Sequence, residues 1–198
     1  MRRPVTSSGD DALLIKAFQK GDKKAFDQLV IRHKDKIFNL CYRFLGDYEE
    51  ANDSAQETFV KAYESLNTFR LESAFSTWLY RIAVNTCKNK IGSSAYKAKR
   101  KTVSIDSPGN PSDEPLAMEI PNGSPSPLLR MEERETLELL QSALNHLPEE
   151  FRIAVTLRDV EGLSYEAVAE VTGLALGTVK SRIARARTEL RNKLRGVL

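Results

Sequence analysis

The side chains best suited to chemistry lie between residues 178 and 195, where lysine and arginine far outnumber acidic residues. Arginine and lysine can donate hydrogen bonds to guanine O6 and N7 in a DNA groove, or bind phosphates through charge. Apolar residues recur among these cations at four- and three-residue steps, at Val179, Ile183, Ala186, Leu190 and Leu194. This spacing predicts an amphipathic helix that buries one stripe and presents a basic face to a nucleic acid.

A shorter helix is predicted just before the basic one. Ser164 can cap its first turn, and Gly173 is suited to end it. Residues 174–177 would then form a turn, and Thr178 can cap the basic helix. A short helix, a glycine-containing turn and a longer basic helix are typical of a helix-turn-helix, whose second helix enters the major groove.

This docking predicts which side chains of the second helix meet DNA. The residues expected to face base edges are Lys180, Ser181, Ala184 and Arg185. Those expected to lie near phosphates are Arg187, Arg191, Lys193 and Arg195. The alternative is a basic helix that is only solvated. Cap, turn, apolar stripe and charge all agree, and this agreement favours DNA binding.

A second candidate site lies in the first half of the chain, on a helix predicted over residues 77–91. One side of this helix carries Trp78, Arg81, Asn85 and Lys88. An aromatic ring, cations and an amide are the groups that hold single-stranded nucleic acid by stacking, charge neutralisation and base-edge bonding. Periodicity equally allows Trp78 to pack in the core with Arg81 and Lys88 solvated, so both interpretations stay open.

The remaining sequence offers no sign of catalysis or membrane insertion. No apolar run approaches ~20 residues, and the first residues lack the apolar stretch of a secretion signal. Cys41 and Cys87 are isolated, which predicts a reducing cytosolic compartment without disulfides or a zinc site. His33 and His146 are the only histidines, and no metal spacing, nucleophile elbow or phosphate loop surrounds them. We therefore expect no enzyme activity, no catalytic residue, no metal and no cofactor.

Helical periodicity and turn residues predict an all-α fold of two small helical domains. The first domain is expected over residues 10–91, starting with a helix that Asp10 and Asp11 can cap. Residues 92–127 are rich in proline, serine and glycine, which predicts a flexible linker with a relaxed span of ~35 Å. The second domain, residues 128–198, would hold four helices and end in the helix-turn-helix.

Two motifs in this order resemble a known family. Residues 53–70 (DSAQETFVKAYESLNTFR) and 73–89 (SAFSTWLYRIAVNTCKN) are similar to region 2 of bacterial sigma factors. Residues 147–187, which include LPEEFRIAVTLRD and TVKSRIARAR, resemble region 4. The chain is similar to the two-domain extracytoplasmic-function group of the sigma-70 family.

The resemblance implies roles for particular residues. Those implied to bind the minus-ten element are Phe69, Phe75, Trp78, Arg81, Asn85 and Lys88, with the loop from Phe69 to Phe75 and Asn85 capturing a flipped base. Those implied to bind the minus-thirty-five element are Thr178, Lys180, Ser181, Arg182, Ala184, Arg185 and Arg187. Ala184 departs from relatives that carry a bulkier residue. Those implied to dock polymerase are Asp53, Gln56, Glu57 and Phe59.

The resemblance also implies a function and partners. The chain would bind core RNA polymerase through its β′ coiled coil and β flap, recognise promoter DNA and initiate transcription in the cytoplasm. An anti-sigma factor would hold it inactive, and it would be a monomer when free. The alternative is an autonomous helix-turn-helix regulator. That class needs a dimerisation element or a ligand pocket, and the first domain shows neither an obvious heptad nor a pocket signature.

Overall fold

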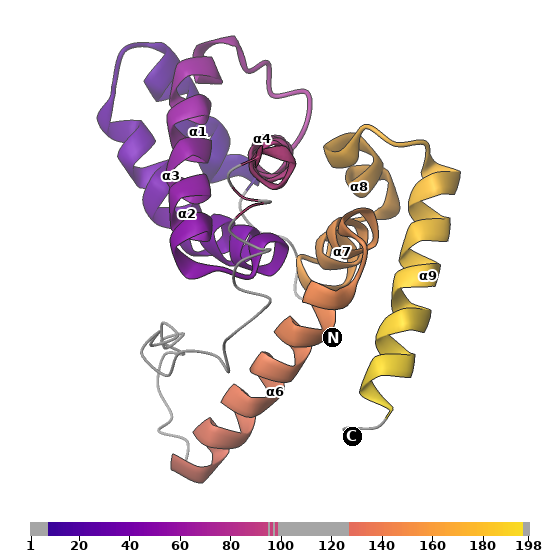
Figure 1. Cartoon of the computed structure of the whole chain (residues 1–198). Helices are drawn as coiled ribbons and strands as arrows, with labels where there is room; N and C mark the ends of the chain where they lie inside the picture. The colour runs from indigo at the N-terminus through magenta and orange to yellow at the C-terminus, as the bar shows by residue number, and fades with distance from the viewer. Residues whose placement is uncertain (1–7, 95, 97, 99–126, 196–198) are drawn as a thin grey trace.

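The computed structural model describes residues 8–94, 96, 98 and 127–195, and every regular element in these ranges is a helix (Figure 1). The elements are α1 (Ser8–Gln19), α2 (Lys24–Leu45), α3 (Tyr48–Ser65), η1 (Leu66–Thr68), α4 (Phe75–Gly92), α6 (Pro127–His146), α7 (Glu149–Val155), η2 (Thr156–Val160), α8 (Tyr165–Thr172) and α9 (Leu176–Leu194). The all-α prediction is confirmed. Among the described residues, no helix combines the length and apolar character needed to cross a membrane.

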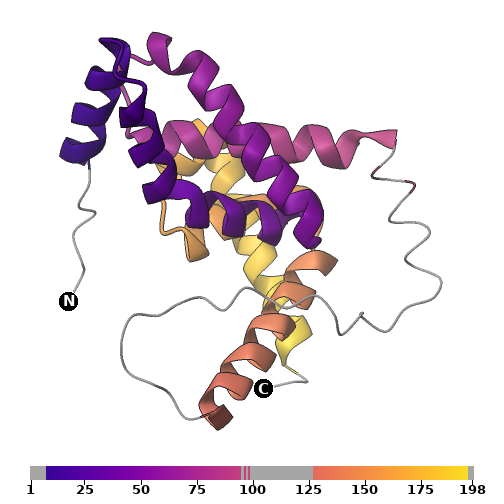
Figure 2. The ribbon, with the colours of Figure 1, turned by 90° about the vertical axis from the view of Figure 1, so that its left-hand side faces the viewer.

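Helix α2 is the centre of a first unit, formed by α1 to α4, and packs against the other three helices (Figure 2). Its buried stripe follows the helical repeat and includes Phe26, Leu29, Ile37, Leu40, Cys41 and Phe44. Each fully buried aliphatic or aromatic side chain of this kind contributes ~1.5–3 kcal/mol through the hydrophobic effect. Cys87 of α4 is also fully buried, and its contact with Cys41 and its burial raise the pKa of its thiol.

Helices α6 to α9 form a second unit, in which α9 packs against α6, α7 and α8. Val179, Ile183 and Ala186 of α9 are buried, which confirms the first part of the predicted stripe. The side chain of Ser164 accepts a hydrogen bond from the Ala167 amide at 3.1 Å, as expected of the cap of α8. Gly173 ends α8 with φ at 70°, a left-handed conformation that favours glycine.

Three helix starts differ from the sequence prediction, and one of them is that of α4, which begins at Phe75 instead of residue 77. Helix α9 begins at Leu176, because the carbonyl of Ala175 already accepts from the Val179 amide at 3.1 Å. Thr178 therefore lies in the first turn of α9 and is not its cap. Helix α1 begins at Ser8, and Asp11 lies inside it, only 4% exposed, instead of capping it.

The start of the predicted linker packs against the first unit. Tyr96 is 5% exposed, and its hydroxyl donates to the carbonyl of Leu45 at 2.8 Å. Helix α6 begins at Pro127, the last residue of the predicted linker, and proline is favoured at the first position of a helix. The predicted linker residues 99–126 lie outside the described part of the chain.

The two units pack directly against each other. Helix α4 lies beside α8 (Figure 1), α2 packs against α7, and buried side chains of both units belong to one hydrophobic core. The guanidinium of Arg152 donates to the carbonyl of Phe44 at 2.6 Å, across the contact between the units. The Tyr80 hydroxyl donates to Glu161 at 2.8 Å. Burial is the main cause that raises the pKa of this phenol, and the negative charge of Glu161 raises it further. Docking therefore supplies a donor to the Phe44 carbonyl at the C-terminal end of α2, which the helix itself leaves unpaired.

Candidate nucleic-acid interfaces

The basic face of α9 is open to solvent. The four residues expected to face base edges, Lys180, Ser181, Ala184 and Arg185, are all exposed. They lie on consecutive turns of the helix, away from the buried stripe of Val179 and Ile183. The structure thus brings together the predicted base-reading residues on one continuous surface.

Two further arginines of α9 are held by carboxylates of the same unit. Arg182 forms an ion pair with Glu150 of α7. Arg187 binds Asp159 of η2 with both Nε and Nη2, at 2.8 and 2.6 Å, and this bidentate bond raises the pKa of the guanidinium. Fork-to-fork pairs of this kind fix the orientation of both groups. DNA phosphates would have to compete with Glu150 and Asp159 for these two cations.

The aromatic residues predicted to bind the minus-ten element form a buried cluster. The Phe69 and Trp78 rings lie 4.8 Å apart between centroids, and the Phe75 and Trp78 rings lie 5.7 Å apart. All three side chains are less than 10% exposed. Of the two interpretations left open by periodicity, the structure has Trp78 in the core. Arg81 and Asn85, on the same helix, are exposed.

The loop between Phe69 and Phe75 contains a strained residue. Leu71 has φ at 58°, the only positive φ of a non-glycine residue in the described ranges. A left-handed backbone costs a residue with a β-carbon roughly 1–2 kcal/mol and persists only where its surroundings enforce it. Such residues concentrate at functional sites, and this one lies beside the aromatic cluster.

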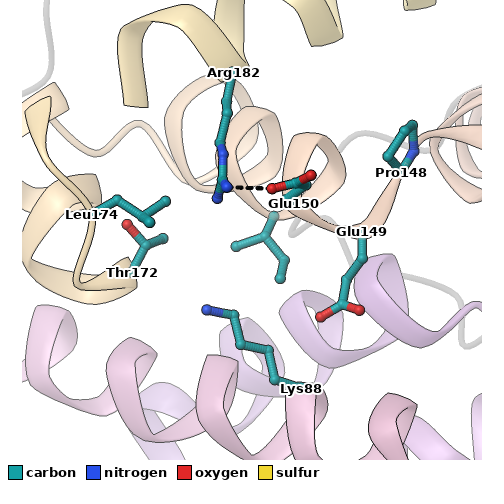
Figure 3. A pocket seen from close by; sticks show the side chains of 8 residues that line it. Lys88, Pro148, Glu149, Glu150, Thr172, Leu174 and Arg182 are labelled. Carbon is teal, nitrogen blue, oxygen red and sulfur yellow. Dashed lines mark ion pairs between the residues drawn. The ribbon is translucent and has the colours of Figure 1, made fainter. Parts of the chain in front are cut away.

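Lys88 differs from its neighbours on α4 because it faces a cavity between the two units. The cavity has a volume of about 410 Å³ and is lined by residues of both units. Figure 3 shows the Lys88 side chain directed into it from one side, with Arg182 and Glu150 on the other side. Glu149 also lines the cavity. The cavity is therefore lined by one cation from each predicted DNA-binding surface, Lys88 and Arg182, and by two carboxylates of α7, Glu149 and Glu150.

The predicted polymerase-docking residues divide into two groups. Asp53, Gln56 and Glu57 are exposed on α3 and form an acidic ridge. Lys61 binds Glu57 at 2.7 Å, and Lys90 lies 3.8 Å from Asp53. Phe59 is half-buried and packs against the core of the first unit. The ridge is thus available to a partner, whereas most of Phe59 is not.

Several contacts that shape these surfaces were missed by sequence reasoning. Arg152 was not singled out, although it is buried and contacts both units. His33 was noted only as a histidine without metal spacing, yet its Nε2 lies 2.9 Å from an Asp11 carboxylate oxygen. Helical periodicity could not reveal these pairs, because their partners lie on different helices far along the chain.

The fold and its surfaces define a class of protein. An exposed basic helix lies in one helical unit, and in the other unit an exposed arginine and amide lie on α4, the helix that follows a strained, aromatic-bounded loop. This combination has the charge and polarity typical of a DNA-binding protein. Among the described residues, no cluster of three or more side chains could hold a metal ion.

Comparison with known proteins identifies the family. Residues 29–95 match the family model for sigma-70 region 2, and residues 137–190 match the model for sigma-70 region 4. The RNA polymerase sigma-H factor of Pseudomonas aeruginosa is 41% identical over 188 residues, which cover 95% of each chain. The ECF RNA polymerase sigma-E factor of Haemophilus influenzae is 39% identical over 196 residues, or 95% of this chain and 97% of the relative. The chain belongs to the extracytoplasmic-function group of the sigma-70 family.

Solved structures of sigma factors share the whole fold. CnrH, in complex with the cytosolic domain of CnrY, superposes with a TM-score of 0.66 at 26% identity, covering 94% of this chain and 97% of CnrH. The sigma factor RpoE, in complex with the anti-sigma factor NepR from Bartonella quintana, gives a TM-score of 0.61 at 28% identity. The match covers 87% of this chain and 98% of the RpoE chain. The expected two-unit architecture is confirmed.

Proposed function

We propose that this protein is an alternative sigma factor that binds core RNA polymerase in the cytoplasm, directs it to particular promoters and helps to open them. The observation that carries the proposal is the presence of both matched regions in one chain, each with an exposed surface of suitable chemistry. The basic face of α9 suits duplex DNA, and Arg81 and Asn85 suit unpaired bases. The alternative, an autonomous helix-turn-helix regulator, gives the first unit no role.

The second unit would read the minus-thirty-five element. Helix α9 would enter the major groove, with Lys180 and Arg185 bonding guanine O6 and N7 and Thr178 and Ser181 adding polar contacts. The small side chain of Ala184 would leave room for a close approach to a base. Arg182 and Arg187 would bind phosphates once these displace the carboxylates that hold them in the free protein.

The first unit would capture an unstacked base of the minus-ten element. The Asn85 amide would bond the base edge, and the loop from Phe69 to Phe75 would form the wall of the receiving pocket. Extrusion of a base costs a few kcal/mol, so the receiving surface must already be in place. Trp78 would support that wall from the core, in keeping with its burial. Lys88 would lie near the DNA backbone after leaving the cavity.

The acidic ridge of Asp53, Gln56 and Glu57 would dock core polymerase, with the β′ coiled coil as its target and the β flap contacting the second unit. We propose domains at residues 10–91 and 128–198, joined by residues 92–127. The two promoter elements lie about two helical turns of DNA apart or more, ~70 Å, so engagement of both requires the docked units to separate. An anti-sigma factor of the kind bound to RpoE would be a regulator of that step.

Arg185→Ala is expected to weaken binding of the minus-thirty-five element by ~1–3 kcal/mol, because it removes a bidentate base contact. The polymerase holoenzyme would be titrated against a duplex carrying the element and against duplexes with single base changes. Selectivity at one base pair should fall along with affinity. Arg191→Ala, on the same helix and also exposed, is the matched control. It should weaken all duplexes alike, so equal losses of selectivity in the two variants would refute the assigned contact.

In vitro transcription tests the function itself. Sigma-free core polymerase would be supplied with a library of promoter fragments, with and without this protein. New transcripts from a subset of fragments that share two sequence elements would support the proposal. Protection of DNA by the protein alone, without new transcripts, would support the autonomous regulator instead.

A further inference from the structure

Helix α1 contacts the first end of the loop between Phe69 and Phe75 directly, and it reaches the other end through His33 of α2. At the first end, the Gln19 side chain donates from Nε2 to the carbonyl of Leu66 at 3.0 Å and to the carbonyl of Phe69 at 2.9 Å. Both partners are acceptors, so only the amide nitrogen of Gln19 can make these bonds. The backbone that leads into the loop is therefore fixed by a side chain from the C-terminal end of α1.

At the other end of the loop, α1 acts through a buried hydrogen bond between Asp11 and His33. Asp11 and His33 are 4% and 6% exposed, and their Oδ2 and Nε2 atoms lie 2.9 Å apart. Arg32 donates to the other carboxylate oxygen of Asp11 at 3.3 Å. The His33 ring packs edge-on against Phe75, with centroids 5.2 Å apart and planes inclined by 70°. Asp11 thus fixes the ring against which Phe75 rests.

The loop needs external support of this kind. It carries Leu71 at a φ of 58°, and a strained backbone relaxes unless neighbouring contacts determine its conformation. Asn85 lies on α4, the helix that begins at Phe75, whereas Phe69 lies at the start of the loop. The separation of these two groups, which would together enclose a captured base, therefore depends on both ends of the loop.

We propose that α1 positions the base-capturing loop, with Gln19 and the Asp11–His33 pair as positioning residues for minus-ten recognition. The proposal rests on the proposed function and adds residues that do not themselves touch DNA. Its consequence is that a change on α1 alters which base is captured without changing polymerase docking, because the acidic ridge on α3 is separate from these contacts.

Gln19→Met tests the proposal, because methionine keeps the length and neutrality of the side chain and removes the donor. The probe would be a labelled single strand carrying the minus-ten sequence of a promoter recovered in the transcription experiment, bound to holoenzyme. The wild-type holoenzyme should prefer this strand over strands with a substituted central base. In the Gln19→Met holoenzyme this preference should be about tenfold smaller, the size expected for the loss of a net hydrogen bond or two. Binding to core polymerase and to the minus-thirty-five duplex should stay unchanged.

Two further variants separate positioning from general stability. Gln28→Met makes the same change at an exposed glutamine of α2 and should leave base preference unchanged. Gln19→Lys restores a donor of similar reach and should recover most of the preference. Unchanged preference in Gln19→Met, or a loss matched by weaker polymerase binding, would overturn the proposal. A wild-type holoenzyme without any base preference would instead overturn the proposed function.

Discussion

Holoenzyme with Asn85→Ala should bind its promoter as duplex DNA but open it at least about tenfold less well. Asn85 is exposed on α4, the helix that follows the loop beginning at Phe69, and presents both a donor and acceptors. A bidentate amide contact to a base is worth ~1–3 kcal/mol of discrimination, and capture of the unstacked base provides the driving force for opening. Alanine is favoured at an exposed helical position, so folding should not suffer.

Permanganate reactivity of thymines near the start site measures this opening directly. Affinity of the variant for core polymerase, measured by competition with the wild-type protein, should be unchanged. Asn89→Ala is the matched control, since Asn89 is exposed one turn further along α4 and has no assigned base contact. Equal permanganate reactivity in wild-type and Asn85→Ala complexes would exclude the role given to Asn85.

Arg152→Met should lower the free energy of unfolding by ~3 kcal/mol and undock the two units. The guanidinium is buried and donates to the carbonyls of Phe44, Asn145 and Leu147, at 2.6, 3.2 and 3.2 Å. Removing it leaves these acceptors without that donor, and each buried unsatisfied group costs ~1–3 kcal/mol. Relief of the desolvation of the cation offsets part of the loss.

Urea denaturation measures the stability change, and small-angle scattering of the folded protein measures the docking. The radius of gyration should increase in the variant, because Arg152 provides a short contact between the units. Arg191→Met is the control, since Arg191 is exposed on α9. Unchanged stability together with an unchanged radius would show that the apolar contact between α4 and α8 suffices to hold the units together.

Local sequence patterns predicted most of the secondary structure of this protein. Helical spacing of apolar residues identified α9 and its buried face, because burial of one stripe is a property of a single helix. Ser164 and Gly173 marked the ends of α8 for the same reason, since a cap is formed within a few residues. The exposure of Lys180 and Arg185 follows from their position opposite that stripe.

Trp78 shows where local patterns stop being sufficient. Its helical spacing was compatible with a surface role and with a core role, and only the packing of Phe69 and Phe75 against it decides for the core. The sequence equally left open whether Arg187 forms an ion pair, because its partner Asp159 lies on another element. Both outcomes depend on how helices pack, which one helix cannot specify.

The sequence by itself determined the helices, the order of the two sigma regions and the side chains with the chemistry to bind DNA. Only the tertiary structure decided which of these side chains are free for a partner, how the units dock through Arg152, and that α1 holds the loop that begins at Phe69. The physical reason is the distance along the chain over which each kind of interaction acts. Helix formation and capping arise from residues within a turn or two, whereas hydrogen bonds such as that of Gln19 to Phe69 arise only when distant helices are packed together.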